Sequence, residues 1–276
     1  MKFYKYNGAG NDFVIIPNLD GAIKREEYSA LARQLCRRRV SVGADGLMLV
    51  EPSQKADLRM AFYNADGTEG EMCGNGARCI CRFGFETGLS GRRQTVETVS
   101  GLVHGERLDK RRYRVRLTDP TVIRPHLTAE AEGRVYDCGY VELGTPGLPH
   151  AVVHVPGLRA MAPEELLPLG RALRYHPAFP KGANVNFFDL ESKNHIYERT
   201  FERGVEDFTL ACGTGTASAA IILALRGLTD RRGFLADMAG GTLEVDLEGE
   251  GDRIAGVYLT GPTTVVAAGD IIDEEL

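Results

Sequence analysis

The sequence lacks the features that mark secreted and membrane-spanning proteins. Its N-terminus runs straight into Asn7, Gly8 and Asp12 without the apolar core of a signal peptide. No stretch approaches the ~20 apolar residues that a bilayer-spanning helix needs. Six cysteines in 276 residues are too sparse for a secreted disulfide scaffold. These absences predict a cytoplasmic protein with reduced thiols and no membrane partner.

An excess of charge of one sign is also missing. The chain carries 33 basic and 38 acidic side chains, a formal net charge of −5. Its Arg-rich stretches, at 37–39 and 111–112, are short and typical of solvated surface, so no nucleic-acid partner is expected. With 43% apolar and 26% charged residues, the composition is that of a soluble globular protein. Its length fits one large domain or two of ordinary size.

One motif occurs twice. Residues 72–79 read Met-Cys-Gly-Asn-Gly-Ala-Arg-Cys, and residues 211–218 read Ala-Cys-Gly-Thr-Gly-Thr-Ala-Ser. Each motif places a cysteine, Cys73 or Cys212, directly before Gly-x-Gly and a run of small residues with helical character. The two cysteines lie 139 residues apart in a chain of 276, which is almost half its length. This spacing predicts two related lobes that contribute to one site.

The rest of the chain fits such a doubling. Helices are expected at 26–38, 77–87, 163–173 and 217–225, and short strands separated by turns account for most of the remainder. Pro120 and Pro125 mark the expected boundary between the lobes. Each half is thus mostly strand, with one central helix behind its cysteine. The predicted fold class is α+β.

A cysteine at a helix start is chemically distinctive. The first N–H groups of a helix are unpaired, and the helix dipole places partial positive charge there. Glycines leave those N–H groups open to an anion. In comparable sites the thiol pKa falls from ~8.5 towards ~3.5–7.5. We therefore expect a favoured thiolate at Cys73 and Cys212.

The other four cysteines are better interpreted as core residues. A free cysteine is usually a small buried apolar residue, and this applies to Cys36, Cys79, Cys81 and Cys138. A zinc site needs pairs such as Cys-x-x-Cys together with a second pair or histidines. The spacing of positions 73, 79 and 81 offers neither, so no metal is expected.

Two opposed thiols suit proton transfer at a carbon atom. A thiolate removes a proton from one face, and a thiol delivers one to the other face, which inverts a stereocentre without a cofactor. The α-proton of an amino acid is very weakly acidic, so preorganised donors must hold the carbanion. Two helix N-termini aimed at the α-carboxylate would supply them.

Six motifs extend this interpretation to nearly the whole chain. They are Gly8-Ala-Gly-Asn11-Asp-Phe, Asn64-Ala-Asp-Gly67 before the Cys73 motif, Pro149-His150, Asn184-Val-Asn-Phe, Phe201-Glu-Arg-Gly-Val205 and Ala211-Cys-Gly-Thr-Gly215. In this order they resemble the diaminopimelate epimerase family, within the cofactor-independent amino-acid racemases and epimerases. The resemblance implies an isomerase that converts LL-2,6-diaminopimelate to the meso form, a step towards lysine and peptidoglycan.

The resemblance also implies an architecture. Two pseudo-symmetric lobes, each a strand-rich barrel around a central helix, would enclose the active site in the cleft between them. The N-terminal lobe would cover residues 1–118, with 264–276 returning to it, and the C-terminal lobe would cover 119–263. The family works on a small-molecule amino acid without cofactor or metal, and a homodimer is plausible by resemblance.

Site residues follow from the same motifs. By resemblance, Cys73 and Cys212 are the two acid–base residues. The residues that would hold the substrate are Asn11, Asn64, Gly74, Asn75, Asn184, Glu202, Arg203, Gly213 and Thr214. Arg203 also has a physical case, because a guanidinium fork pairs bidentately with a carboxylate. For His150, an orienting role and a purely structural role both remain open.

Three departures from the family pattern leave the cysteines untouched. Leu148 stands where the family usually has Asn in Gly-Asn-Pro-His, the stretch 203–212 is one residue longer than usual, and Gly46 replaces a common Gln. The first two concern recognition of the far end of the substrate, and they motivate an alternative, a racemase of another amino acid such as histidine. A second alternative, from another class, is an amino-acid-binding redox sensor in which Cys73 and Cys212 form a switchable disulfide.

Overall fold

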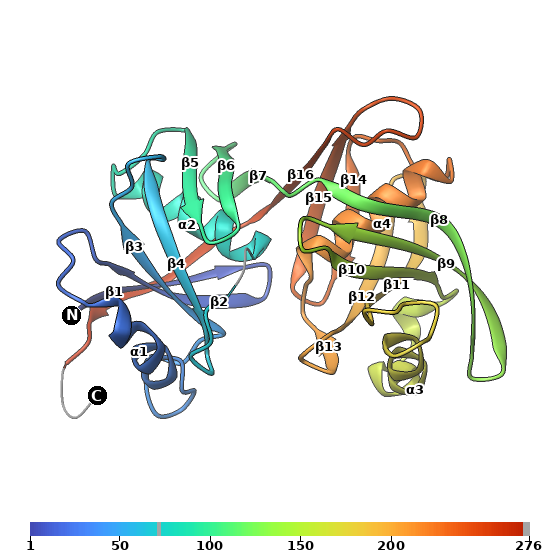
Figure 1. The fold of residues 1–276 in the computed structure, drawn as a ribbon, viewed down its shortest axis with the longest axis horizontal. Coiled ribbons are helices and arrows are strands. Elements are labelled where there is room, and N and C mark those ends of the chain that lie inside the picture. Colours follow the sequence, from blue (N-terminus) through green and yellow to red (C-terminus); the bar gives the residue numbers. More distant parts are fainter. Residues whose placement is uncertain (71–72, 273–276) are drawn as a thin grey trace. The chain divides into compact units, whose positions relative to one another are not determined.

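The computed structural model describes residues 1–70 and 73–272, so Met72 of the first motif lies outside the described residues, as do positions 273–276 of the expected C-terminal return. The chain divides into two compact units (Figure 1): Met1–Val115 with Gly261–Leu276, and Arg116–Thr260. The boundaries expected from the sequence, at 118/119 and 263/264, each lie three residues after the boundaries in the structure. No helix in the described part of the chain is long and apolar enough to cross a membrane.

The first unit is built mainly from strands. They are β1 (Lys2–Gly8), β2 (Asn11–Pro17), β3 (Gly46–Glu51), β4 (Leu58–Asn64), β5 (Arg93–Thr98), β6 (Gly101–Arg107), β7 (Arg112–Arg116) and β17 (Thr264–Asp270). Its helical elements are the 3-10 turn η1 (Arg25–Glu27) and the helices α1 (Tyr28–Leu35) and α2 (Gly74–Glu86). The last strand of the chain pairs with the first, since β17 lies antiparallel to β1.

The second unit has the same character. Its strands are β8 (Pro120–Ala131), β9 (Arg134–Leu143), β10 (Leu148–His154), β11 (Asn184–Ser192), β12 (His195–Glu202), β13 (Asp207–Thr209), β14 (Phe234–Met238), β15 (Gly241–Glu248) and β16 (Gly256–Pro262). Its helical elements are the 3-10 turn η2 (Leu158–Ala160) and the helices α3 (Pro163–Arg174) and α4 (Gly213–Leu225).

The strands of the two units pair in equivalent orders. The first unit has the order β17-β1-β2-β3-β4-β5-β6-β7. The second has β8-β9-β10-β11-β12-β14-β15-β16, with β13 added to β12. Parallel pairs occur at the same two places, and a helix-containing connection joins each of them. The two pseudo-symmetric lobes expected from the sequence are therefore confirmed.

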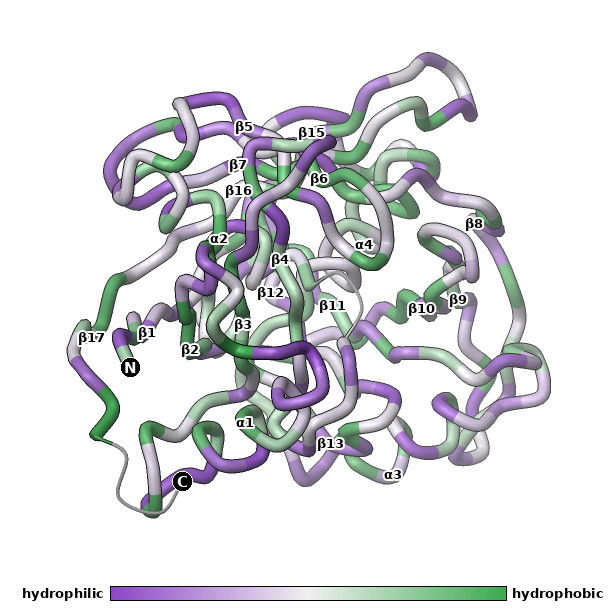
Figure 2. Tube along the Cα trace, turned by 60° about the vertical axis from the view of Figure 1, so that its left-hand side comes forward, coloured by the Kyte–Doolittle hydropathy of each residue, from purple (hydrophilic) through white to green (hydrophobic). Residues whose placement is uncertain are grey.

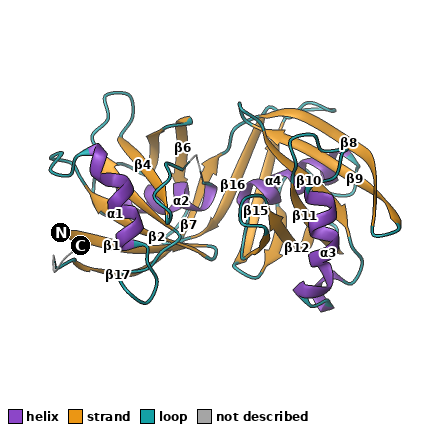
Figure 3. Cartoon of the chain, turned by 60° about the horizontal axis from the view of Figure 1, so that its bottom comes forward, coloured by secondary structure: helices purple, strands orange, loops and turns teal. Residues whose placement is uncertain are grey.

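Each lobe holds one helix inside its sheet and one outside (Figures 1 and 3). The inner helix α2 contacts β1, β2, β5 and β6, and α4 contacts β8, β9, β10, β11 and β15. Because each inner helix touches strands far apart in its sheet, the sheet curls around it. The outer helix α1 contacts β3 and β4, while α3 contacts β8, β11 and β12. This is the strand-rich, helix-centred lobe predicted for each half.

Hydrophobicity explains why α4 lies inside the second lobe. Residues 215–223 of α4 are all buried, as expected of a helix that is apolar on every side. By contrast, α1 buries only one face, formed by Tyr28, Leu31, Ala32 and Leu35. In the sheets, the strands β2, β3 and β10 are largely hydrophobic (Figure 2).

Two sequence-based expectations were inaccurate. The inner helices begin at Gly74 and Gly213, three and four residues before the expected starts, because glycines weaken the helical signal of a first turn. Pro125 does not mark a boundary but lies within β8. The register of β8 against β9 shifts between Arg124 and Leu127, and this irregularity accommodates a residue without an N–H.

Candidate active site

Cys73 and Cys212 occupy equivalent positions, each at the N-cap of an inner helix. Both have an extended backbone, with φ −105° and ψ 119° for Cys73 and φ −126° and ψ 100° for Cys212. The carbonyl oxygen of Cys73 accepts from the N–H of Ala77 at 2.8 Å, and that of Cys212 accepts from Thr216 at 2.9 Å. The N–H groups of each first turn have no acceptor within the helix. Each lobe therefore presents a thiol beside a helix start of the kind that suits an anion.

Exposure separates these two cysteines from the other four. Cys73 and Cys212 are partly exposed, whereas the remaining four are buried, as predicted. Burial raises the pKa of Cys36 to about 11 and that of Cys79, Cys81 and Cys138 to about 12. Those four thiols are protonated at neutral pH and belong to the core.

Cys212 does not have the lowered pKa that its helix start predicted. Close packing of protein around this partly exposed side chain raises the pKa of the thiol above its usual value, and the carboxylate of Glu202 raises it further. The hydroxyl of Thr214, 3.5 Å from Sγ, and the N–H of Gly215 act in the opposite direction without offsetting this rise. Cys212 therefore rests as a thiol.

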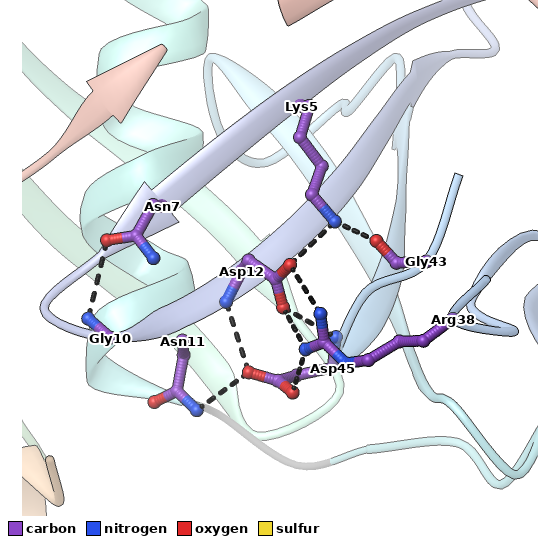
Figure 4. A network of polar contacts seen from close by, with 8 residues as sticks. All are labelled: Lys5, Asn7, Gly10, Asn11, Asp12, Arg38, Gly43 and Asp45. Carbon is purple, nitrogen blue, oxygen red and sulfur yellow. Dashed lines mark hydrogen bonds and ion pairs between the residues drawn. The ribbon is translucent and has the colours of Figure 1, made fainter. Parts of the chain in front are cut away.

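In the first lobe, Asn11 and Asn75 hold one another (Figure 4 shows Asn11 and its neighbours). Nδ2 of Asn75 donates to Oδ1 of Asn11 at 2.7 Å. Nδ2 of Asn11 in turn donates to Asp45 at 3.1 Å. Arg38 pairs with Asp45 at 2.8 Å and with Asp12 at 2.6 Å. Asn11 is thus anchored to a network of charged groups at the β1–β2 turn.

A buried cation completes this arrangement. Arg78 is fully buried; Nη2 donates to Oδ1 of Asn75 at 2.7 Å, and Nη1 donates to the carbonyl oxygen of Gly74 at 3.2 Å. Burial lowers the pKa of Arg78 to about 10, while the neighbouring thiols Cys79 and Cys73 act in the opposite direction. Arg78 therefore orients the start of α2. The motif contained this residue, but sequence reasoning gave it no role.

Asn64 stands at the end of β4 and is exposed. Nδ2 donates to the hydroxyl of Thr68 at 3.0 Å, and its backbone N–H donates to the carbonyl oxygen of Thr68 at 2.9 Å. Both hydrogen bonds shape the turn that precedes the Cys73 motif. Asn64 thus lies on a turn, apart from the paired amides of Asn11 and Asn75.

The second lobe gathers a different set of predicted residues. The buried side chain of Asn184 accepts from the backbone N–H of Arg203 at 2.8 Å and donates to the carbonyl oxygen of Pro149 at 3.1 Å. Arg203 is partly buried, and one of its guanidinium nitrogens donates to the carbonyl oxygen of Lys181 at 3.2 Å. Glu202 ends β12 and acts on the Cys212 thiol. Asn184 thus binds the backbone of Arg203, and Glu202 is the residue directly before Arg203.

The longer stretch 203–212 is accommodated in a hairpin. Gly204 and Glu206 have positive φ values, 91° and 58°, and form the turn that leads into β13. The carboxylate of Glu206 accepts from the N–H of Gly204 at 3.0 Å, from Arg174 at 3.1 Å and from the Tyr175 hydroxyl at 3.0 Å. The hairpin is thus anchored on the end of α3.

Sequence reasoning missed a polar cluster beneath the start of α4. It consists of His150, Asn186, Glu198, Thr200 and Thr216, all of which are buried. Strand alternation carried a signal, because Ile196, Glu198 and Thr200 fall on the buried face of β12.

One arrangement in the described residues has the donor types of a metal site. Donor atoms of Glu191, His195 and Asp237 lie within 4.8 Å of one another. However, the guanidinium of Arg159 pairs with Glu191 and lies 3.0 Å from Asp237. The cluster is therefore already balanced by a cation, and it holds none of the predicted site residues.

Solved structures identify the fold. The chain superposes on a phenazine biosynthesis protein of the PhzF family from Bacillus anthracis with a TM-score of 0.75 and 17% identity, covering 99% of each chain. A probable proline racemase from Agrobacterium radiobacter gives a TM-score of 0.70 at 18% identity, covering 99% of this chain and 93% of that one. The chain thus shares the fold of these two proteins, and its match to epimerase sequences makes it an isomerase of the epimerase type.

Sequence comparison identifies the family. The diaminopimelate epimerase model matches residues 3–123 and 144–266. The diaminopimelate epimerase of Methanothrix thermoacetophila is 38% identical, over 100% of this chain and 98% of the relative. That of Aquifex aeolicus is 36% identical, over 100% and 99%. The chain belongs to the diaminopimelate epimerase family.

Proposed function

We propose that this chain interconverts LL-2,6-diaminopimelate and the meso form, with Cys73 and Cys212 as its two acid–base residues. The observation that carries the proposal is that two lobes of one topology each present a partly exposed cysteine at the N-cap of the inner helix. Family membership supports the choice of substrate. The reaction belongs to lysine biosynthesis.

The mechanism exchanges one proton for another. A thiolate takes the α-proton from one face, so that an S–H bond forms and the C–H electron pair passes into the α-carboxylate group. The second thiol then gives its proton to the opposite face of the carbon, and its sulfur becomes the thiolate. The number of protons is unchanged and nothing is oxidised, so no redox partner is required. Since Cys212 rests as a thiol, we assign it as the proton donor when Cys73 is the base.

The carbanion needs a site that accepts negative charge. We assign this role to the first-turn N–H groups of α2 and α4, at Gly74, Asn75, Gly213 and Thr214. The side chains of Asn11 and Asn75 hold each other and so keep the first of these helix starts in place.

The rest of the substrate needs separate contacts. Arg203 uses one nitrogen for Lys181, and its remaining N–H groups are suited to a carboxylate. Glu202 suits an ammonium group of the substrate, and Asn184 holds the backbone of Arg203. We also assign a substrate contact to Asn64, on the turn before Cys73.

A histidine racemase is the nearest alternative. Leu148, which replaces an amide of the family pattern, is partly buried as the first residue of β10. The longer hairpin at 203–212 also lies next to the proposed distal contacts. Both features concern substrate choice, whereas the proton transfer would be the same.

The test is uptake of deuterium at the α-carbon in deuterated water, followed by mass spectrometry. Wild-type protein should exchange diaminopimelate, and Cys73→Ala or Cys212→Ala should each reduce the rate by roughly 10³-fold. Cys138→Ala, in the core, is the control that keeps exchange. Deuterium uptake with histidine but not with diaminopimelate would identify histidine as the substrate instead. Wild-type rates in both single variants would instead favour the redox-sensing binding protein.

The expected cytoplasmic location, the homodimer and the absence of cofactor and metal remain predictions. The location would suit the mechanism, because it keeps both thiols reduced.

A further inference from the structure

A buried carboxyl group lies beneath the start of α4, and the proposed mechanism does not use it. Glu198 is 1% exposed, and its Oε2 lies 2.7 Å from the hydroxyl oxygen of Thr216. Its Oε1 has no hydrogen-bond partner among the described residues. An ionised carboxylate that is out of water needs several donors or a cation. One hydroxyl is a poor substitute.

The hydroxyl of Thr216 has a second neighbour. Its oxygen lies 3.1 Å from the carbonyl oxygen of Cys212. A hydroxyl carries one proton and cannot donate to both the carboxylate and the carbonyl. If Glu198 is protonated, its O–H donates to Thr216, and Thr216 donates to the carbonyl of Cys212. Both short contacts are then satisfied by a relay of two hydrogen bonds.

The surroundings favour this protonated form. Burial raises the pKa of Glu198 to about 8, and only the hydrogen bond with Thr216 opposes the rise, so neither Lys nor Arg compensates the charge. Among the described residues, the other charged or titratable groups near this cluster are Cys212 on α4, Glu202 and Arg203 at and just after the end of β12, and His150 on β10. Burial lowers the pKa of His150 to about 3, which leaves it neutral.

We propose that Glu198 is a positioning residue for Cys212 that works as a neutral carboxylic acid. In this state it secures the first turn of α4 through Thr216. When it ionises, it breaks the relay and places a buried negative charge behind the thiol, which disfavours the Cys212 thiolate. Glu198 then limits activity at alkaline pH. The inference deepens the proposed function, since it rests on Cys212 as an acid–base residue.

The first experiment needs no turnover. Native protein is alkylated with iodoacetamide across a pH series, and the modified tryptic peptides are quantified by mass spectrometry. The peptide 204–226 carries Cys212, and the peptide 60–78 carries Cys73. In Glu198→Gln the alkylation profile of Cys212 should move down by about one pH unit, because the like charge is gone. The profile of Cys73 should stay in place. Coincident Cys212 profiles in wild type and variant would overturn the proposal.

A matched control carries the same chemical change elsewhere in the second lobe. Glu142→Gln replaces another buried glutamate, one that already has Lys181 at 2.7 Å as its cation. It should leave the Cys212 profile unchanged. An equal shift in this variant would assign the effect to general electrostatics and contradict the role of Glu198.

The second experiment separates the charge from the hydrogen bond. Glu198→Gln keeps a donor for Thr216 and should retain exchange activity. The alkaline fall of its kcat/KM should move to higher pH. Glu198→Leu loses both, so kcat should fall several-fold at every pH with little change in KM. If the alkaline limb of Glu198→Gln matches wild type, the proposal fails. If diaminopimelate is not exchanged at all, the proposed function fails, whereas the alkylation shift still tests Glu198.

Discussion

The two lobes share a topology but differ in what lies beneath the helix that carries the cysteine. Equivalent strands pair in equivalent registers, so positions can be matched between lobes. The matched pairs are Phe13 and His150, Met48 and Asn186, Phe62 and Thr200, and Met60 and Glu198. The first lobe is apolar at all four positions, and the second is polar at all four. The fold thus requires side chains that fill the space beneath the inner helix, but these side chains can be apolar or polar.

Glycines in the helix starts support this matching. A Cβ on Gly76 of α2 would collide with the end of the Met48 side chain, and a Cβ on Gly215 of α4 would collide with Oδ1 of Asn186. Equivalent glycines therefore meet equivalent strand residues. Each inner helix lies so close to its sheet that the third residue of its first turn, Gly76 or Gly215, has no room for a side chain.

The two lobes also place different ionisable groups near their cysteines. The first places a guanidinium, Arg78, on the helix that follows Cys73. The second places the carboxyl groups of Glu198 and Glu202 near Cys212. A nearby cation favours a thiolate, whereas the carboxylate of Glu202, and that of Glu198 when it ionises, favours a thiol. The duplicated motif thus provides two similar thiols, and their surroundings make them unequal.

The largest difference between lobes should come from adding a methyl group at the helix starts. Gly215→Ala should destabilise the protein by roughly 2–4 kcal/mol, because Asn186 is held by His150, Thr200 and the carbonyl oxygen of Ala151 and cannot move without losing hydrogen bonds. Gly76→Ala should cost about 1 kcal/mol or less, since the end of a methionine side chain adapts. Urea unfolding of the two variants measures both values. Equal losses would mean that the polar cluster adds no rigidity.

The next effect concerns the buried cation. Arg78→Met should lower α-proton exchange by roughly 10–100-fold, because Asn75 loses its donor and Cys73 loses a neighbouring positive charge. Alkylation of Cys73 should move to higher pH, while that of Cys212 should not move. Arg78→Lys is the control, as it keeps the charge without the planar fork. An unshifted Cys73 profile in Arg78→Met would remove the electrostatic contrast between the lobes.

Much of this comparison could be predicted from the sequence, because the doubled motif is local. Cys-Gly-x-Gly before a run of small residues specifies a helix start, and its recurrence after half a chain length indicated two lobes. The wrong interpretation of Pro125 has a tertiary cause. A proline usually interrupts a strand, but β8 absorbs it through a register shift against β9.

The polar cluster and the pKa of Cys212 could not be predicted in the same way. Glu198 and Asn186 meet Thr216 and Gly215 only because β11 and β12 pass beneath α4. The thiol pKa depends on Glu202 and on packing, both of which come from outside the motif. A helix start favours a thiolate, but here the close packing of protein around the partly exposed thiol outweighs it.

A further difference is the acid-side loss of stability that the buried His150 of the second lobe should contribute. His150 has a pKa of about 3 in the fold against an ordinary value of 6.5, so the unfolded chain takes up its proton first. Its contribution to stability is complete above pH 6.5 and is lost as the pH falls towards 3. His150→Phe, which copies Phe13, should remove this loss, worth up to roughly 1.4 kcal/mol for each pH unit in that window. Urea unfolding at several pH values from 7 to 4 measures it, with His104→Gln on the surface as control. Parallel curves for wild type and His150→Phe would mean that His150 is not held neutral.

The smallest effect should come from the charged network that anchors Asn11. Arg38 is 58% exposed at its side chain, and Asp12 keeps Lys5 at 2.7 Å when Arg38 is removed. Arg38→Ala should therefore cost about 0.5–1 kcal/mol and raise KM no more than a few-fold. The second lobe anchors Arg203 through the neutral amide of Asn184, which salt does not screen. High salt should consequently lower the stability of the wild type nearly to that of Arg38→Ala. The loss of stability caused by Asn184→Ala should be the same at low and at high salt. A difference between wild type and Arg38→Ala that persists in 1 M NaCl would show that Arg38 acts by packing, and the contrast between an ionic and a neutral anchor would then be wrong.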